Sequence, residues 1–176
     1  MKYLVISDLH GSKSALKINQ LLKKGNFDKV ILLGDILYHG PRNDVPKDYD
    51  PKLLIKNLNA IKDKIIAVKG NCDAYVDEMV LEFKLEDYID MKINSLNAHL
   101  EHGHFINDYK NDGKNLIMYG HTHITRLDKI DGIIYFNPGS ISIPKEHEEK
   151  CYGVIDEEKI TIYNIEDKII KELKYR

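Results

Sequence analysis

The chain of 176 residues contains no tryptophan, five prolines and only two cysteines. The cysteines, Cys72 and Cys151, are too few for a disulfide scaffold and favour a reducing compartment. No apolar run reaches the length of a membrane span, and Asp8 interrupts the N-terminus before a secretory apolar region can form. These absences exclude a small disulfide-bonded protein and predict a cytoplasmic protein with no membrane partner.

An excess of charge of either sign is also absent. The sequence has 26 Lys and Arg residues against 28 Asp and Glu, a formal net charge of -2, and no run of five like charges. Binding to long nucleic acid depends on many basic side chains that contact phosphates, so we predict no long nucleic-acid partner. The length and the 43% hydrophobic content are typical of one globular domain, which we expect to cover residues 1–176.

Three continuous apolar runs, at residues 3–7, 29–33 and 65–68, predict strands in the first half. Helical patterns separate them: one begins at Ser12 and ends at Gly25, and the next begins at Asp50. Continuous rather than alternating apolar strands are typical of a parallel sheet that is covered on both faces. The first half is therefore predicted to form βα-type repeats around a parallel sheet.

The second half contains short strand-like runs with few helical patterns between them. The expected strands cover residues 88–93, 98–102, 116–119, 133–136, 152–155 and 160–165. We predict an α/β fold with a mixed sheet, or with two stacked sheets, rather than a purely doubly wound fold.

Residues that could bind metal follow five of these strands. The loops are Asp8-Leu9-His10, Gly34-Asp35, Gly70-Asn71, His102-Gly103-His104 and Gly120-His121-Thr122-His123. Ligands in α/β sheets bind at the carboxyl ends of strands, so these loops are expected to share one edge. A loop hydrogen bond or a helix cap could explain any one of them, so the signal is the ordered set.

The chemistry of this set indicates divalent metal. Asp, Asn and His offer the oxygen and nitrogen ligands that such ions bind. A carboxylate such as Asp35 can bridge two cations about 3.5–4 Å apart, so the set indicates a pair of ions. A structural zinc site is the alternative, although such sites are usually compact and rich in thiolates.

In its order Asp-x-His, Gly-Asp, Gly-Asn, His and Gly-His-x-His, the sequence from Asp8 to His123 resembles the calcineurin-like metallophosphoesterases. Asn137-Pro138-Gly139-Ser140 is a further element similar to that family, although an ordinary turn also explains it. The short chain and the segments 34–43 and 70–73 resemble most the small YfcE-type phosphodiesterases of the superfamily.

The resemblance implies a four-layer α/β/β/α sandwich and a two-metal site. One metal would be held by Asp8, His10, Asp35 and His123, and the other by Asp35, Asn71, His102 and His121. In this family a metal-bridging water or hydroxide attacks phosphorus in line, so no protein nucleophile is required. The resemblance thus predicts catalytic roles for Asp35, the bridge, and for Asn71.

Four further residues are candidates near this site. Cys72 stands where most of the superfamily carries a histidine that assists the leaving oxygen, and a thiol is a poor proton donor at neutral pH. We weigh a catalytic role for Cys72 against that of a half-buried filler. His39 is a candidate catalytic and substrate-binding residue, or a loop imidazole bonded to backbone. Arg42 is a candidate substrate contact.

His104 is a candidate substrate contact or a partner for a metal-bound imidazole, with solvent exposure as the alternative. His99 and His147 lack such a context and are interpreted as strand or surface histidines. The segment 145–150 is interpreted as a solvated loop.

The function predicted from these residues is a metal-dependent phosphodiesterase that hydrolyses small phosphodiesters. Mn²⁺ is the first choice of ion, with Fe, Ni, Co or Zn as alternatives, because the ligands mix carboxylate, amide and imidazole. A phosphomonoesterase acting on phosphoprotein or nucleotide is the second hypothesis. A non-catalytic scaffold like the retromer subunit that shares this fold is the third. A homo-oligomer is a further possible assembly, which the sequence neither predicts nor excludes.

Overall fold

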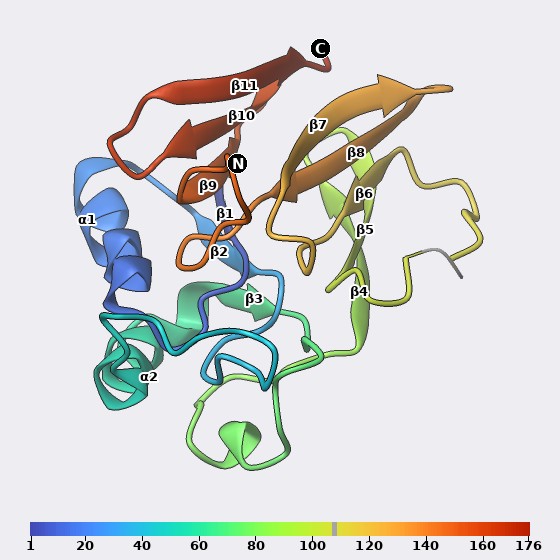
Figure 1. The fold of residues 1–176 in the computed structure, drawn as a ribbon. Coiled ribbons are helices and arrows are strands. Elements are labelled where there is room, and N and C mark those ends of the chain that lie inside the picture. Colours follow the sequence, from blue (N-terminus) through green and yellow to red (C-terminus); the bar gives the residue numbers. More distant parts are fainter. Residues whose placement is uncertain (107–108) are drawn as a thin grey trace.

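A computed structural model describes residues 1–106 and 109–176 of the chain. Its strands form two sheets of six and five strands that pack against each other (Figure 1). In these described residues both α-helices lie beside the first sheet, on the side away from the second.

The first sheet has the strand order β11-β10-β9-β1-β2-β3. Its parallel strands are β1 (Tyr3–Ile6), β2 (Lys29–Leu32) and β3 (Ile65–Ala67). Its antiparallel strands are β9 (Cys151–Ile155), β10 (Lys159–Asn164) and β11 (Ile169–Lys174). The apolar strand β1 is fully buried at the centre, as its continuous hydrophobic run predicts.

The second sheet has the strand order β4-β5-β6-β8-β7. Its members are β4 (Tyr88–Ile93), β5 (Leu96–Glu101), β6 (Leu116–Met118), β7 (Thr125–Ile130) and β8 (Ile133–Pro138). Strand β6 pairs in parallel with β5 and β8, while β4 and β7 pair antiparallel at the edges. The sheet is therefore mixed.

The helices begin and end where the local sequence predicts. The helices are η1 (Lys13–Leu16), α1 (Lys17–Lys24), α2 (Pro51–Asn59), η2 (Lys62–Lys64) and η3 (Asp77–Met79). The Ser12 hydroxyl accepts a hydrogen bond from the Ser14 N–H at 3.1 Å, and the Asp50 carboxylate accepts one from the Leu53 N–H at 3.1 Å. Gly25 ends α1. None of the helices is long and apolar enough to cross a membrane, as far as the described residues extend.

Two hydrophobic cores hold these layers together. One lies between the helices and the first sheet and includes Leu4, Leu32 and Leu54. The other lies between the two sheets and includes Val5, Leu100 and Phe136. The alternation of Leu4 and Val5 between the two cores shows that β1 is covered on both faces.

The predicted α/β class with two stacked, mixed sheets is confirmed. On the outer face of the second sheet, Tyr109 from the irregular segment between β5 and β6 stacks on His99 of β5, with ring centroids 4.0 Å apart. Strands β7 and β11 were not among the expected strands. Both are edge strands rich in charged residues, a composition that protects sheet edges but weakens the strand pattern in the sequence.

Candidate metal centre

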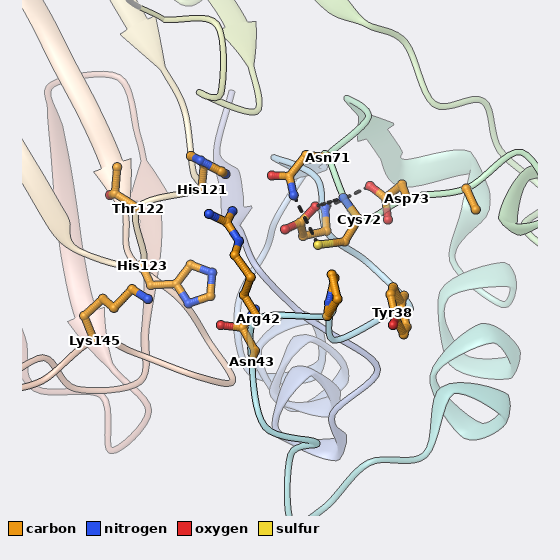
Figure 2. Close-up of a pocket in the computed structure, with 14 residues that line it drawn as sticks. Tyr38, Arg42, Asn43, Asn71, Cys72, Asp73, His121, Thr122, His123 and Lys145 are labelled. Atoms are coloured by element: carbon orange, nitrogen blue, oxygen red, sulfur yellow. Dashed lines mark hydrogen bonds between the residues drawn. The ribbon is translucent and has the colours of Figure 1, made fainter.

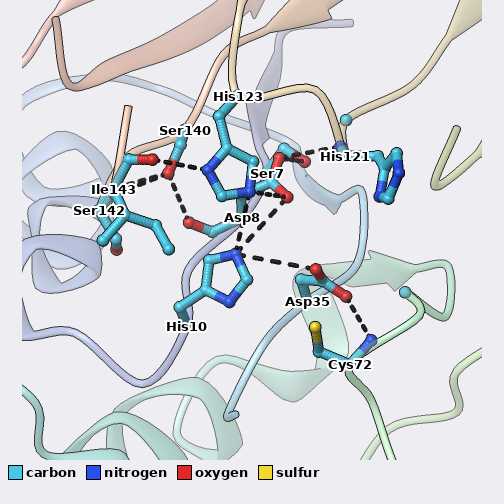
Figure 3. A network of polar contacts seen from close by, with 12 residues as sticks. Ser7, Asp8, His10, Asp35, Cys72, His121, His123, Ser140, Ser142 and Ile143 are labelled. Atoms are coloured by element: carbon cyan, nitrogen blue, oxygen red, sulfur yellow. Dashed lines mark hydrogen bonds and ion pairs between the residues drawn. The ribbon is translucent and has the colours of Figure 1, made fainter. Parts of the chain in front are cut away.

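The five loops predicted to share an edge do so. Ile6 of β1 lies opposite Leu32 of β2, and Leu32 lies opposite Ala67 of β3, so the loops that follow these strands leave the sheet together. In the second sheet Leu100 of β5 lies opposite Met118 of β6, which brings the loops after β5 and β6 to the same place. The side chains from both sheets meet between these loops (Figure 3).

Four of the predicted ligands form a buried group: Asp8, His10, Asp35 and His123. One ligand atom from each lies within 4.8 Å of the others. The His123 Nε2 atom lies 3.2 Å from Asp8 Oδ1 and 3.2 Å from His10 Nε2. His10 Nε2 also lies 3.7 Å from Asp35 Oδ2. This is the set that the family resemblance assigns to one ion.

Asp35 also faces a second imidazole from another direction. His102 Nε2 lies 3.3 Å from Asp35 Oδ2, and both side chains are buried. The rings of His102 and His121 are 5.2 Å apart, and His121 and Asn71 line the open side of the site. Asp35 therefore stands between two groups of candidate ligands, although in this structure Asn71 directs its Nδ2 atom to Cys72 Sγ at 3.3 Å.

Each buried imidazole of the centre is oriented by a backbone carbonyl. The Nδ1 atoms of His10, His102 and His123 lie 2.8, 2.6 and 2.6 Å from the carbonyl oxygens of Tyr38, Leu33 and Ile143. A carbonyl oxygen can only accept, so Nδ1 carries the proton and donates it. In the neutral ring, the lone pair of each Nε2 atom then points to the centre of the site, which is the tautomer that binds a metal.

The backbone of these loops is strained. Five predicted ligands have positive φ angles: Asp8 (53°), His10 (47°), Asp35 (55°), His121 (65°) and His123 (58°). Such a conformation costs a non-glycine residue of order 1–3 kcal/mol and persists only where the surroundings enforce it. Here the loops enforce it on one another, because the His10 N–H donates to the Asp35 carbonyl at 2.9 Å. Strain of this kind is typical of functional sites.

The site fits a cation. Among the described residues, Asp8 Oδ1 and His102 Nε2 are buried without a hydrogen-bond partner, and leaving such atoms unpaired is costly. Burial raises the pKa of Asp8, but the neighbouring imidazoles of His10 and His123 outweigh it and hold that pKa far below its usual range. Buried carboxylates beside inward-directed nitrogen lone pairs are a donor set for a divalent metal.

Several residues that hold these ligands were not predicted to belong to the site. The Ser7 hydroxyl donates to Asp8 Oδ2 at 2.6 Å, and the Ser140 hydroxyl donates to the Asp8 carbonyl at 2.8 Å. Asn137 Nδ2 donates to the Gly120 carbonyl at 2.7 Å, just before His121. The segment 137–140 is therefore more than a connecting turn. Its similarity to the family pattern was the signal that could have assigned it this role.

Asp73 joins the loops of β2 and β3. Its carboxylate accepts hydrogen bonds from the N–H groups of Asp35, Ile36 and Gly70 at 2.7–2.8 Å. The loops lie so close that a Cβ atom added to Gly70 would fall 2.1 Å from Asp35 Oδ1. Asp73 thus fixes the backbone of the candidate bridging residue from behind, and only glycine fits opposite it.

The candidate ligands open into a cavity of about 720 Å³ (Figure 2). Arg42, Asn71 and Cys72 line it, as does Lys145, which the sequence placed in a solvated loop. Burial, with a further contribution from Asp35, raises the pKa of the Cys72 thiol to about 12. The thiol is therefore neutral at physiological pH, which makes it a poor nucleophile. The Cys72 N–H, in contrast, donates to Asp35 Oδ1 at 2.8 Å.

Two of the weaker candidates lie elsewhere. The His39 ring packs between Tyr38 and Tyr49, with centroids 4.6 and 5.6 Å away, while its neighbours Tyr38 and Gly40 line the cavity. A substrate contact by His39 stays a prediction that this placement does not support. His104 is exposed and 5.6 Å from the His102 ring, and the Leu33 carbonyl rather than His104 orients His102. Buried His99 lies on β5 and exposed His147 lies in a loop.

The structure has two stacked sheets and a group of Asp and His side chains where the loops of both sheets meet. This combination is typical of a metal-binding phosphoesterase. The model of the calcineurin-like phosphoesterase superfamily domain matches residues 1–159. The chain belongs to this superfamily, and the predicted class of enzyme, a hydrolase of phosphoric esters, is confirmed.

Among its relatives is the phosphodiesterase YfcE of Escherichia coli K12, which is 35% identical over 175 residues, or 97% of this chain and 95% of that protein. A solved structure of Yfce, described as a phosphoesterase from E. coli, matches with a TM-score of 0.95 at 33% identity and covers all of both chains. A Vps29 structure from Entamoeba histolytica also covers all of both chains, with a TM-score of 0.71 at 18% identity, and shows the fold alone.

Proposed function

We propose that this chain is a metal-dependent phosphodiesterase that hydrolyses small phosphodiesters at a centre of two divalent metal ions. The observation that carries the proposal is the position of Asp35. Its Oδ2 atom lies 3.7 Å from His10 Nε2 and 3.3 Å from His102 Nε2, so one carboxylate faces a ligand group on each side. Asp8, His10 and His123 would complete one ion site, and Asn71, His102 and His121 the other.

When bound, the ions would activate the attacking water and neutralise negative charge on the phosphoryl group. The chain's own residues set up that chemistry. Backbone carbonyls keep the protons of His10, His102 and His123 on Nδ1, away from the ions. Ser7 and the His121 N–H share Asp8 Oδ2, which leaves Oδ1 for the ion. Asp73 fixes the position of Asp35.

Four features support hydrolysis of a small diester by water. The relative YfcE is named a phosphodiesterase, and the cavity of about 720 Å³ is of the size that holds a small molecule. The formal net charge of -2 provides no extended basic surface for long nucleic acid. The neutral Cys72 thiol lies at the cavity wall and leaves the attack to water.

The test is chelation followed by the return of single metals. The protein is stripped with a chelator, dialysed, and assayed on bis(p-nitrophenyl) phosphate with Mn²⁺, Fe²⁺, Co²⁺, Ni²⁺ or Zn²⁺ added back. We expect activity to disappear and to return most fully with Mn²⁺. An Asp35→Asn variant purified in parallel controls for contaminating phosphoesterases. No recovery with any ion would sink the proposal.

The same assay separates the alternatives. A higher kcat/KM on p-nitrophenyl phosphate than on the diester would favour a phosphomonoesterase. A purified protein that binds no metal and hydrolyses neither ester would favour a non-catalytic scaffold. Metal analysis of the protein as purified identifies which ions it carries and in what ratio to the chain.

A further inference from the structure

Two positive side chains line the cavity beside the candidate metal ligands. Arg42 belongs to the loop that follows β2 and Asp35, and Lys145 belongs to the loop that follows the buried Ser140. In Figure 2 the Arg42 side chain extends from its loop toward His121, and Lys145 lies beside His123. The Lys145 N–H donates to the His123 carbonyl at 3.4 Å, which fixes this loop against the ligand.

Neither cation has a counter-charge within the parts of the chain that the structure describes. Both side chains are exposed, and no carboxylate lies within 4.0 Å of either, whereas Lys17, Lys114 and Arg126 are each paired. The carboxylates that line the cavity are engaged elsewhere. Asp73 accepts three backbone N–H groups, and Asp35 faces the imidazoles of the centre.

Metal ions bound at the centre would add to this excess of positive charge in the cavity. Two divalent ions with the carboxylates of Asp8 and Asp35 would leave about two positive charges. A phosphodiester brings only one negative charge, so the centre alone already compensates it. Arg42 and Lys145 are then two further cations that a simple diester does not need.

The side chains of Arg42 and Lys145 bind anions in different ways, and together they suit a phosphate group. The guanidinium of Arg42 can bind two oxygens of a phosphate side by side, and the ammonium of Lys145 acts as a point charge. The cavity of about 720 Å³ also exceeds what a single phosphodiester group occupies, which leaves room for an additional substituent.

We propose that Arg42 and Lys145 form a receptor for a second phosphate group on the substrate, so that the preferred diesters carry a further phosphate beside the ester that is cleaved. This inference rests on the proposed phosphodiesterase function, whose substrate class it specifies. Arg42 and Lys145 bind the additional phosphate, and the centre around Asp35 hydrolyses the phosphodiester.

A matched pair of substrates tests this directly. Thymidine 5′-(p-nitrophenyl phosphate) and its 3′-phosphorylated analogue have the same leaving group and differ only in the second phosphate. We expect the wild-type protein to prefer the 3′-phosphorylated diester by about tenfold in kcat/KM, mainly through a lower KM, as charge-assisted contacts of this kind allow. The preference should shrink as salt is added.

The Arg42→Gln/Lys145→Gln variant should reduce this preference to about twofold or less. The control is Lys23→Gln/Lys52→Gln, which removes two exposed lysines outside the cavity and has the same net charge. It should keep the preference. Equal losses on both substrates would mean that the two cations contact the cleaved phosphate instead, and would overturn the inference. So would a wild-type protein with no preference.

A binding measurement separates failure of this inference from failure of the proposed function. Calorimetry on the Mn²⁺-loaded protein compares thymidine 3′,5′-bisphosphate with thymidine 5′-phosphate, without turnover. We expect about tenfold tighter binding of the bisphosphate, and loss of this difference in Arg42→Gln/Lys145→Gln. If the protein hydrolyses neither ester yet discriminates these ligands, the phosphodiesterase proposal fails and the receptor stands. Equal affinities would overturn the receptor.

Discussion

The described residues contain two clusters in which histidines meet carboxylates, and the clusters are built differently. At the metal centre, the residues come from five loops, and pairs such as His123 and Asp8 are far apart in the sequence. The second cluster, which we call the outer cluster, consists of Asp90, His99 and Glu101. It lies on two neighbouring strands, β4 and β5, where Asp90 is the cross-strand partner of His99.

The difference that matters is what each Nδ1 atom contacts. At the metal centre Nδ1 donates to a backbone carbonyl, which leaves Nε2 aimed at other ligands. In the outer cluster Nδ1 of His99 lies 2.7 Å from a carboxylate oxygen of Asp90, and Nε2 lies 3.8 Å from Glu101. None of the outer three residues has a positive φ angle. A histidine whose Nδ1 donates to a backbone carbonyl in a strained loop is thus placed to bind metal. A histidine whose Nδ1 pairs with a carboxylate in a regular hairpin is placed to stabilise the fold.

The largest effect should follow from Asp35→Asn. Asparagine keeps the shape of the side chain but removes the charge that allows two cations to lie close together, so we expect loss of metal and a fall in turnover of at least about a thousandfold. Metal analysis and diester hydrolysis are the measurements. Glu101→Gln, which removes a carboxylate from the outer cluster, should leave metal content intact. An Asp35→Asn protein with wild-type metal and rate would mean that Asp35 is not the bridge.

A smaller effect is expected from Asp73→Asn, which breaks the backbone anchoring behind the centre. The amide nitrogen cannot accept a hydrogen bond, so at least one N–H of Asp35, Ile36 or Gly70 loses its partner. We expect about 1–3 kcal/mol lower stability and a loss of about 10–100-fold in metal affinity. Urea unfolding and metal titration would measure these losses.

Asp77→Asn is the matched control for Asp73→Asn. Asp77 is also a buried aspartate in the same segment, but among the described residues its carboxylate accepts only from the Ala74 N–H, at 2.8 Å, and it has no role at the centre. It should lose stability without losing metal affinity. Equal metal affinities for the two variants would show that Asp73 only stabilises the loop.

At the metal centre, the ligands could be predicted from the sequence, whereas the residues that support them could not. Asp8, His10, Asp35, His102 and the His121 to His123 segment were predictable because each follows a strand and the strand ends coincide. The supporting contacts were not. Ser7 bonds the carboxylate of its neighbour Asp8, while Ser140 and Asp73 bond the backbone of loops that are distant in the sequence. No local spacing reports these contacts, and for Ser140 only the family resemblance of segment 137–140 gave a signal.

The fold was predictable where strands are buried and less so at the edges. Strand β1 is apolar along its whole length because both faces are covered, and it was expected at nearly its observed bounds. Strands β7 and β11 expose charged side chains, so their sequences resemble loops. Lys145 lies in an exposed loop, as predicted, but its place beside the cavity depends on tertiary packing that the sequence does not report.

A still smaller effect should come from the outer cluster, and it should depend on pH. Burial lowers the pKa of His99, but the nearby carboxylates of Glu101 and Asp90 outweigh it and raise that pKa above its usual range. Tyr88, Tyr109 and Lys114 complete the surroundings of this pair. A raised folded pKa means that the protonated histidine stabilises the fold. This contribution is fully present below the unfolded pKa of about 6.5 and is lost as pH rises through the folded pKa.

His99→Gln should therefore destabilise the protein by about 1 kcal/mol more near pH 5.5 than near pH 9. Urea unfolding of both proteins at the two pH values measures this difference. Because the change lies outside the metal centre, metal content and diester turnover should match the wild type. The same loss of stability at both pH values would mean that His99 is neutral in the folded protein.

The smallest effect is expected at Cys72, which lines the cavity but whose thiol is not anchored as the ligands are. Its contact with Asp35 is made by its backbone N–H, which every substitution except proline retains. Because its pKa is raised to about 12, the thiol is neither an available nucleophile nor an effective acid at neutral pH.

Cys72→Ala and Cys72→Ser should therefore keep diester turnover within about threefold of the wild type. The wild-type rate should fall steeply as the leaving-group pKa rises from nitrophenyl to alkyl esters, because no side chain protonates the departing oxygen well. Cys72→His should flatten that dependence, since an imidazolium can supply the proton. Rates on a series of aryl and alkyl diesters measure the slope. If Cys72→Ala abolished turnover while the metals stayed bound, the thiol would take a direct part in the reaction. A side chain that is not held in place as the metal ligands are would then be catalytic.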